Sequence, residues 1–308
     1  MKISIFIGSG FPTPGLEGLV ETSVRAESDG FDGAWYAQLF MEDALTTISV
    51  VGGRTNRIEL GTAVVPSFTR HPWTMAQQAL TTQVATGGRL ALGIGPSHRV
   101  TIEGNFGLRF ERIAEHTEEY VSVVRQLVDN GSVEFVGKHY RVRGEIEVAG
   151  AARFPILISA LGPRMLDVAG RLADGTVTWM VGKSALERHI VARIRAAAEG
   201  SGRPAPRICV GIPIAVTDDR EKAIEQAGRR FAGFSRLPSY RKMLDIEGAD
   251  GPADVAVVGN ETEVERQLRE YAEAGATDIL AMIFPVGRSH EASRERTWSL
   301  LRSLIGRI

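Results

Sequence analysis

Short, continuously apolar runs alternate with amphipathic stretches along nearly the whole chain, and this alternation restricts the fold more than any other feature. We predict eight strands, at residues 2–8, 34–38, 58–65, 90–94, 155–160, 175–179, 208–216 and 279–284. Nearly all are followed by a stretch with helical periodicity, which indicates a parallel α/β fold. The runs are apolar throughout, as expected for strands that are covered on both faces. The preferred architecture is a TIM-like (β/α)8 barrel with insertions, and a doubly wound open sheet is the alternative.

Two stretches interrupt this rhythm. Residues 130–150 contain the sequence FVGKHYRV and are expected to form a small hairpin or an irregular insertion. Residues 233–252 have no clean period and are predicted to be a mobile segment that lies over the barrel mouth as a lid. No linker rich in Ser, Gly or Pro separates self-contained halves, so residues 1–308 are expected to form a single domain.

Charge balance narrows the range of partners. The 308 residues carry 36 Lys and Arg against 37 Asp and Glu, a net charge of −1. No global field therefore attracts nucleic acid or an anionic membrane, and an anionic ligand must be held by a local basic site. The uncharged stretch at 71–88 is too polar to span a membrane, and no targeting segment is visible. We expect a cytoplasmic protein.

Cysteine and histidine usage argues against a metal centre. The single cysteine, Cys209, excludes an internal disulfide and a cysteine-based zinc cluster, and its apolar neighbours predict a buried, unreactive thiol. The six histidines are not clustered with one another as in metal hydrolases, so no metal is expected. His116 lies between charged residues of a predicted helix and is expected to be exposed to solvent.

Ligands of such barrels bind where the strands end, so the residues after each predicted strand are the candidates. These rim segments lie at 8–10, 38–40, 63–67, 95–98, 160–163, 179–183, 217 and 285–288. They are rich in small and apolar residues and poor in carboxylates, whereas glycosidases need a pair of carboxylic acids. The rim therefore suits a flat organic cofactor, for which a large aromatic such as Trp179 could form a wall.

Three features of the rim carry candidate chemistry. The turn GIGPS at 93–97 lacks the third glycine of a dinucleotide fingerprint, and its glycines suit either a close approach of the backbone to a ring or substrate or a tight turn and nothing more. His98 follows this turn and is either a proton donor or acceptor or an ordinary loop histidine. Lys183 and Arg288 follow the sixth and eighth strands and form either a phosphate site or solvated surface charges.

Several motifs resemble the bacterial-luciferase-like monooxygenase superfamily. They are ESDGFD at 27–32, GTAVVPSFTRHP at 61–72, AQQ at 76–78, GRLALGIG at 88–95, ALGP at 160–163, ADG at 173–175 and AGATD at 274–278. Each motif is weak alone, but their order and spacing match the superfamily over nearly the whole chain. The branch that the chain most resembles comprises actinobacterial oxidoreductases that use coenzyme F420.

The resemblance implies a barrel that binds coenzyme F420 or, as the alternative, FMN, and it implies a homodimer. It also implies a non-prolyl cis peptide between Ala63 and Val64, in a bulge of the third strand that supports the cofactor ring. The residues that would line the cofactor are Gly95, Pro96, Ser97, Ala160, Leu161, Gly162, Trp179, Val181, Gly182 and Lys183. Lys183 and Arg288 would lie near its phosphate.

The chain departs from the sugar-phosphate dehydrogenases of this family. These enzymes carry an Asp-His pair after the second strand, where this chain has Gln38-Leu39, and a glutamate after the fourth, where it has His98. The resemblance therefore implies a reductase, or an oxidoreductase of another small organic substrate, in which His98 orients the substrate or delivers a proton with Gln38 or Tyr36. Two alternatives are an FMN-dependent monooxygenase that uses oxygen and a non-catalytic flavin-binding barrel.

Overall fold

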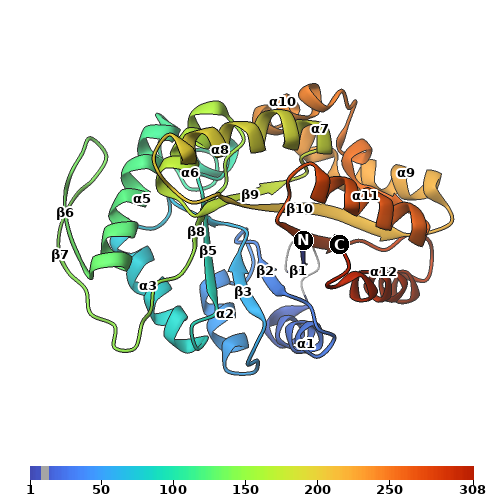
Figure 1. Ribbon diagram of the computed structural model, residues 1–308, viewed down its shortest axis with the longest axis horizontal. Helices are drawn as coiled ribbons and strands as arrows, with labels where there is room; N and C mark the ends of the chain where they lie inside the picture. The colour runs from blue at the N-terminus through green and yellow to red at the C-terminus, as the bar shows by residue number, and fades with distance from the viewer. Residues whose placement is uncertain (8–13) are drawn as a thin grey trace.

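Eight parallel strands pair in a closed ring within residues 1–7 and 14–308, the part of the chain that the computed structural model describes (Figure 1). Their order is β1 (Lys2–Ile7), β2 (Gly33–Tyr36), β3 (Glu59–Thr62), β5 (Leu90–Gly95), β8 (Ile156–Ile158), β9 (Gly175–Trp179), β10 (Arg207–Val216) and β12 (Asp278–Ile283). The pairing of β12 with β1 closes the ring. The predicted TIM-like barrel is confirmed, and the open sheet is wrong because such a sheet would leave two strand edges unpaired.

The third predicted strand divides into two. After β3, the chain passes through a cis peptide bond between Ala63 and Val64, and β4 (Val65–Pro66) then pairs with β5. The cis bond lies where the family resemblance implies it. A further strand that the sequence did not predict, β11 (Val257–Gly259), pairs with the end of β10. Three residues are too few to give a periodic signal.

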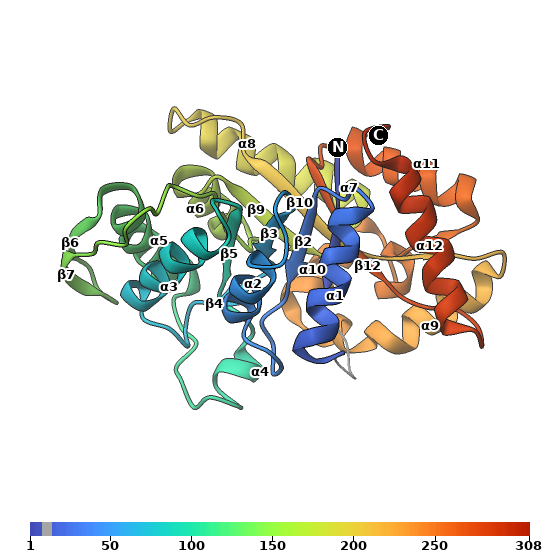
Figure 2. The same ribbon diagram turned by 90° about the horizontal axis from the view of Figure 1, so that it is seen from below.

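Helices cover the outside of the barrel (Figures 1 and 2). They are α1 (Gly15–Ser28), α2 (Ala44–Gly52), α3 (Pro72–Ala85), α5 (Ile113–Asn130), α6 (Pro163–Leu172), α8 (Ala192–Glu199), α9 (Arg220–Phe231), α11 (Glu261–Glu273) and α12 (His290–Leu304). A short α7 (Lys183–Ala185) and a π-helical segment, η1 (Leu186–Val191), precede α8. Helix starts follow local signals: Asp43 accepts a hydrogen bond from the Thr46 N–H at α2, and Asn260 and Glu263 form a capping box at α11. None of the helices within the described residues is long and apolar enough to span a bilayer.

The first insertion is a hairpin. Strands β6 (Ser132–Val136) and β7 (Arg141–Glu145) pair antiparallel and project beside α5 (Figure 1). The carboxylate of Glu119 on α5 accepts hydrogen bonds from the backbone N–H groups of Lys138, His139 and Tyr140 in the hairpin turn. This contact fastens the hairpin to the helix.

The second insertion is helical, so the prediction of an aperiodic segment is wrong. It contains the 3-10 turn η2 (Ala232–Arg236), α10 (Pro238–Glu247) and the 3-10 turn η3 (Pro252–Val255). Pro238 occupies the first turn of α10 and Gly248 ends it in the left-handed conformation, so both residues mark helix boundaries. The helix buries Met243 and Leu244, which accounts for its order.

The barrel interior is filled by side chains from different strands. Trp35, Ala91, Leu157, Val177, Cys209 and Leu280 form one buried cluster. At the amino ends of the strands, Arg207 donates hydrogen bonds of 2.9 Å to Glu59 and to Asp278, and its guanidinium lies 5.3 Å from the Trp35 ring. Cys209 is buried as predicted, and burial raises the pKa of its thiol. Ligands are therefore excluded from the filled interior and must bind at the carboxyl ends.

Candidate active site

A cavity of about 960 Å³ opens at the carboxyl ends of the barrel strands. This volume lies near the upper end of the range of about 300–1,000 Å³ for small-molecule sites. Its floor includes Phe6, Val177, Leu280 and Met282 from three barrel strands. The lid, which we define as residues 230–247, borders the cavity through residues 230–240. The barrel and the second insertion thus build the site together.

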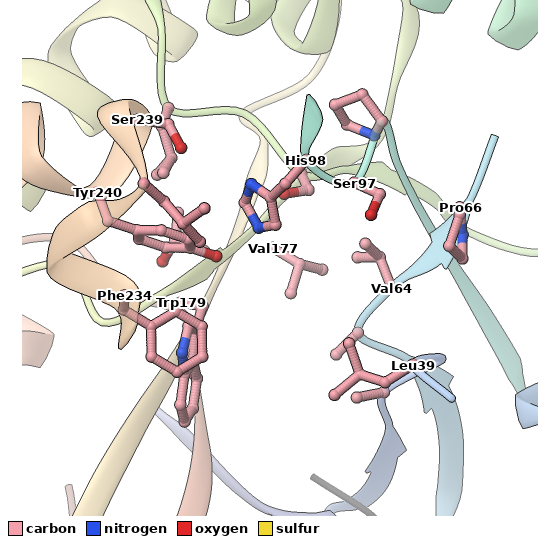
Figure 3. A pocket seen from close by; sticks show the side chains of 18 of the residues that line it. Leu39, Val64, Pro66, Ser97, His98, Val177, Trp179, Phe234, Ser239 and Tyr240 are labelled. Carbon is pink, nitrogen blue, oxygen red and sulfur yellow. The ribbon is translucent and has the colours of Figure 1, made fainter. Parts of the chain in front are cut away.

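One wall is formed by the bulge after β3. Ala63 and Val64 line the cavity, and the Val64 side chain points toward the open space (Figure 3). Gly95 on the neighbouring strand leaves room for it, because a Cβ there would lie 2.5 Å from Val64 Cγ2 and 3.0 Å from Ser159 Cβ. Gly95 is therefore required by the packing of Val64 and does not itself reach the cavity.

The loops after β5 and β9 have unusual backbone conformations. Ser97 has φ 62° and Met180 has φ 51°, so both non-glycine residues lie in the left-handed region. Such conformations are sparsely populated and occur preferentially at functional sites. Ser97 lines the cavity, and Met180 directly follows Trp179, which also lines it.

His98 is the titratable imidazole of the site. It precedes the short helix α4 (Arg99–Ile102), and within the described residues no hydrogen bond engages its side chain. Figure 3 shows the ring beside that of Tyr240, and the two centroids are 5.5 Å apart. Burial lowers the pKa of His98 below 6.5, so its imidazole is neutral at neutral pH.

Aromatic side chains connect the barrel floor to the lid. The Trp179 ring lies 5.3 Å from Phe6 and 5.9 Å from Phe234, and Phe234 lies 5.3 Å from Tyr240. Figure 3 shows Trp179, Phe234 and Tyr240 on one side of the open space and Val64 on the other. Within the described chain, the buried Trp179 Nε1 has no hydrogen-bond partner. Because Nε1 is buried, this wall offers flat apolar surface to a ligand.

The charged residues of the lining are all basic. Among the described residues, Arg99, Arg230 and Arg236 line the cavity and no Asp or Glu does. Arg99 pairs with Glu103 and donates a 2.9 Å hydrogen bond to the Phe110 carbonyl. No group of His, Cys, Asp and Glu within the described residues could hold a metal ion. The site therefore favours an anionic, largely apolar ligand.

The structure brings only part of the predicted site together. The predicted residues that line the cavity are Gln38, Ala63, Val64, Pro96, Ser97, His98, Leu161, Gly162 and Trp179. Those outside the lining are Gly95, Ala160, Val181, Gly182, Lys183 and Arg288. The predicted rim segment at 8–10 lies outside the described residues.

The residues after β9 are used in packing between helices. Lys183 forms an ion pair with Glu270 on α11, and Val181 is fully buried. A Cβ on Gly182 would lie 2.2 Å from the Glu247 carboxyl carbon, and that carboxylate accepts a hydrogen bond from the Ala185 N–H. These contacts direct the segment at 181–183 toward α10 and α11.

Four other predicted residues have surroundings that sequence spacing could not reveal. Ala160 is buried, and Arg288 is exposed in the loop after β12. The Gln38 side chain lines the cavity, but its oxygen accepts from the Ala44 N–H and its nitrogen donates to Asp43, so it also stabilises the start of α2. The Tyr36 hydroxyl bonds to Ser23 on α1 and lies outside the lining.

The lid contributes residues that the sequence reading missed. They are Arg230, Phe231, Phe234, Arg236, Leu237, Pro238, Ser239 and Tyr240. The available signal was their place after the seventh strand, where this fold puts ligand-binding loops, together with three aromatics in eleven residues. His116 was expected to be exposed but is 5% exposed, because the hairpin turn covers it.

Comparison with known proteins gives consistent matches. Residues 1–278 match the model of the luciferase-like monooxygenase family. A protein of Mycobacterium tuberculosis named as a coenzyme F420-dependent oxidoreductase is 30% identical, with 92% of this chain and 85% of that protein covered.

Solved structures share the fold. An F420-dependent secondary alcohol dehydrogenase in complex with an F420-acetone adduct superposes with TM-score 0.82 at 18% identity, covering 99% of this chain and 98% of that one. The oxygenating constituent of 3,6-diketocamphane monooxygenase from Pseudomonas putida, in complex with FMN, gives TM-score 0.77 at 16% identity and covers 100% and 97%.

Proposed function

Since the chain belongs to the luciferase-like monooxygenase family, we propose that it is an oxidoreductase that transfers a hydride between coenzyme F420 and a small organic substrate. The observation that carries the proposal is the cavity at the barrel mouth. It has about 960 Å³ of space, apolar and aromatic walls, and basic but no acidic residues in its described lining. These properties suit a flat, anionic cofactor with a small molecule beside it. FMN is the alternative cofactor, as in the FMN-bound monooxygenase of the same fold.

The residues of the cavity fit such a cofactor. We assign the ring to the space beside Val64, whose side chain points into the cavity, with the Trp179 side chain on the opposite side. The phosphate is assigned to the start of α6, where Gly162 lines the cavity and no side chain caps the helix. Backbone N–H groups of an uncapped first turn bind anions. The Ser97 hydroxyl is a further contact.

When bound, the deazaflavin would supply the hydride-carrying ring carbon. The chain's own residues position the substrate, exclude water and handle the proton. The aromatic wall and lid remove the substrate from solvent, and the neutral imidazole of His98 can take up or pass on a proton at a ring nitrogen. Burial raises the pKa of Tyr240, so its hydroxyl keeps its proton and can donate a hydrogen bond to a substrate oxygen. Gln38 then acts mainly by stabilising the start of α2, where its side-chain oxygen accepts a hydrogen bond from the Ala44 N–H.

The proposal favours reduction, or a substrate other than a sugar phosphate. Within the described residues no carboxylate lines the cavity, so the acid and base pair expected for sugar-phosphate oxidation has no counterpart here. A small molecule is the expected partner, and the homodimer implied by the resemblance stays a prediction.

Cofactor titration tests the proposal. Purified protein is titrated with coenzyme F420 and with FMN while cofactor fluorescence is followed, and we expect a saturable response to coenzyme F420. Tight FMN binding without a response to coenzyme F420, together with oxygen consumption in the presence of reduced FMN, would instead support the monooxygenase. Tight cofactor binding without turnover of any of a broad substrate panel would support the non-catalytic barrel.

Two variants test the assignment of residues. His98→Ala is expected to lower turnover with little change in coenzyme affinity, because the imidazole faces the substrate space. Lys183→Ala is the companion variant: since Lys183 pairs with Glu270 outside the cavity, coenzyme affinity should stay unchanged. A loss of about 1–3 kcal/mol in coenzyme binding would restore the phosphate role that the resemblance implies for Lys183.

A further inference from the structure

We propose that the substrate is an amphiphilic anion, with an apolar body and one carboxylate, phosphate or sulfonate group, and that Arg230 and Arg236 bind this group at the lid side of the cavity. The substrate assignment rests on the proposed function. The anion subsite itself can be tested without coenzyme.

The two arginines are free to bind an anion. Arg230 ends α9 and Arg236 lies in η2, both line the cavity, and neither forms an ion pair with any residue that the structure describes. Arg294 on α12 lies near Arg230: burial first, and then the charge of Arg294, lower the pKa of Arg230. Arg230 and Arg294 thus place positive charge together, and no carboxylate among the described residues pairs with Arg230 or Arg236, a condition that attracts oxyanions.

Other arginines of the same region form ion pairs with nearby carboxylates. Arg229, next to Arg230, pairs with Glu225 at 2.9 Å and lies outside the lining. Arg241 on α10 pairs with Asp245 at 2.8 Å. A cation near the end of α9 is favoured by the helix dipole, but Arg229 meets that preference equally well. The dipole therefore does not explain why Arg230 lines the cavity without an ion-pair partner among the described residues.

The surface next to the two arginines is aromatic and indicates an apolar body for the substrate. Phe231 lies between Arg230 and the aromatic wall, and its ring is 6.2 Å from that of Trp179. Phe234 precedes Arg236 by two residues and also lines the cavity. An aromatic or aliphatic body can pack on these rings while its anionic end reaches the guanidinium groups, which form charge-assisted hydrogen bonds with oxyanions.

The coenzyme also carries an oxyanion, so the source of the bound anion must be resolved. The start of α6, assigned to the coenzyme phosphate, belongs to the β8 side of the ring, whereas Arg230 and Arg236 follow β10. Arg99 differs from both, because it already pairs with Glu103. This separation assigns the lid arginines to the substrate.

The experiment uses a matched pair of fluorescent probes, 1-anilinonaphthalene-8-sulfonate and the uncharged N-phenyl-1-naphthylamine, which share the aromatic frame and differ in the sulfonate. Probe affinity is measured on the full chain, first without coenzyme and then with the coenzyme site saturated. We expect Arg230→Gln and Arg236→Gln each to weaken sulfonate binding about tenfold and to leave the uncharged probe unaffected. Arg229→Gln is the control and should change neither.

The outcomes separate the possibilities. Unchanged sulfonate binding in both lid variants, or equal weakening of the two probes, would overturn the anion subsite. If the variants instead weaken coenzyme F420 binding, or if saturating coenzyme abolishes the arginine-dependent part of sulfonate binding, the oxyanion is the coenzyme's and the substrate assignment is wrong. If the protein binds no coenzyme but sulfonate binding still depends on Arg230 and Arg236, the subsite stands and the proposed function fails.

Discussion

Acid should destabilise this protein through one buried histidine, His116 on α5. Its Nε2 lies 3.0 Å from Ser67 Oγ, and its ring stacks on Phe68 with centroids 3.9 Å apart. Burial, followed by the charge of His139, lowers the pKa of His116 from 6.5 to about 4. Glu119 opposes this shift only in part.

The size of the effect follows from linkage. Between pH 6.5 and about 4, the unfolded chain binds a proton at this imidazole that the folded chain does not bind. At about 1.4 kcal/mol per pKa unit, His116 should remove about 3 kcal/mol from the free energy of unfolding over this range. Its contribution is fully present above pH 6.5 and is lost as the pH falls toward 4. That is a large part of the about 5–15 kcal/mol by which a typical domain is stable.

Urea unfolding of the parent and of His116→Gln, followed by tryptophan fluorescence from pH 4 to 7.5, measures this effect. Glutamine does not titrate, so the free energy of unfolding should fall by about 3 kcal/mol less in the variant than in the parent. Carboxylates titrate in both proteins and cancel in the comparison. Above pH 7 the difference between the two proteins should not vary with pH. Parallel curves down to pH 4 would refute the reasoning.

Two further predictions concern the barrel. Arg207→Met should lower the free energy of unfolding by about 3–5 kcal/mol, because Glu59 and Asp278 would lose their countercharge, and Asp278 is nearly fully buried. The urea midpoint checks this, and a loss below about 1 kcal/mol would contradict a structural role for the cluster. Gly95→Ala should weaken coenzyme binding, since its Cβ would lie 2.5 Å from Val64 Cγ2 and displace that side chain. Gly53→Ala is the control, because Gly53 lies outside the cavity lining and the nearest atom to its added Cβ is the Val50 carbonyl oxygen at 3.6 Å; equal effects on coenzyme affinity would refute the assignment.

Local pattern accounts for most of the elements that were predicted. Strands covered on both faces must be apolar throughout, and helix starts carry their own signals, such as Pro72 at the start of α3. The lid helix α10 escaped prediction because its ten residues owe their order to Met243 and Leu244 packing on the rest of the fold. Pro238 and Gly248 interrupt the sequence on either side of this helix and mark its two ends.

The residues of the candidate site also divide into those that the sequence could predict and those that it could not. Residues at or just after the ends of barrel strands, such as Val64, His98 and Trp179, could be chosen from the sequence, because parallel strands in a barrel bring their carboxyl ends to one rim. The basic residues could not be chosen. Lys183 is paired with a residue 87 positions away, whereas Arg230 has no ion-pair partner among the described residues.

What followed from the chain alone was the eight-fold repeat of strand and helix, and with it the rim where a ligand must bind, because both depend on neighbours close in sequence. Which side chains face that rim depended on contacts between distant segments. The hairpin turn buries His116, and Glu270 pairs with Lys183. The lid brings Arg230 and Tyr240 to the cavity. Burial and ion pairing are properties of the folded surface, and they determined the charge of this site.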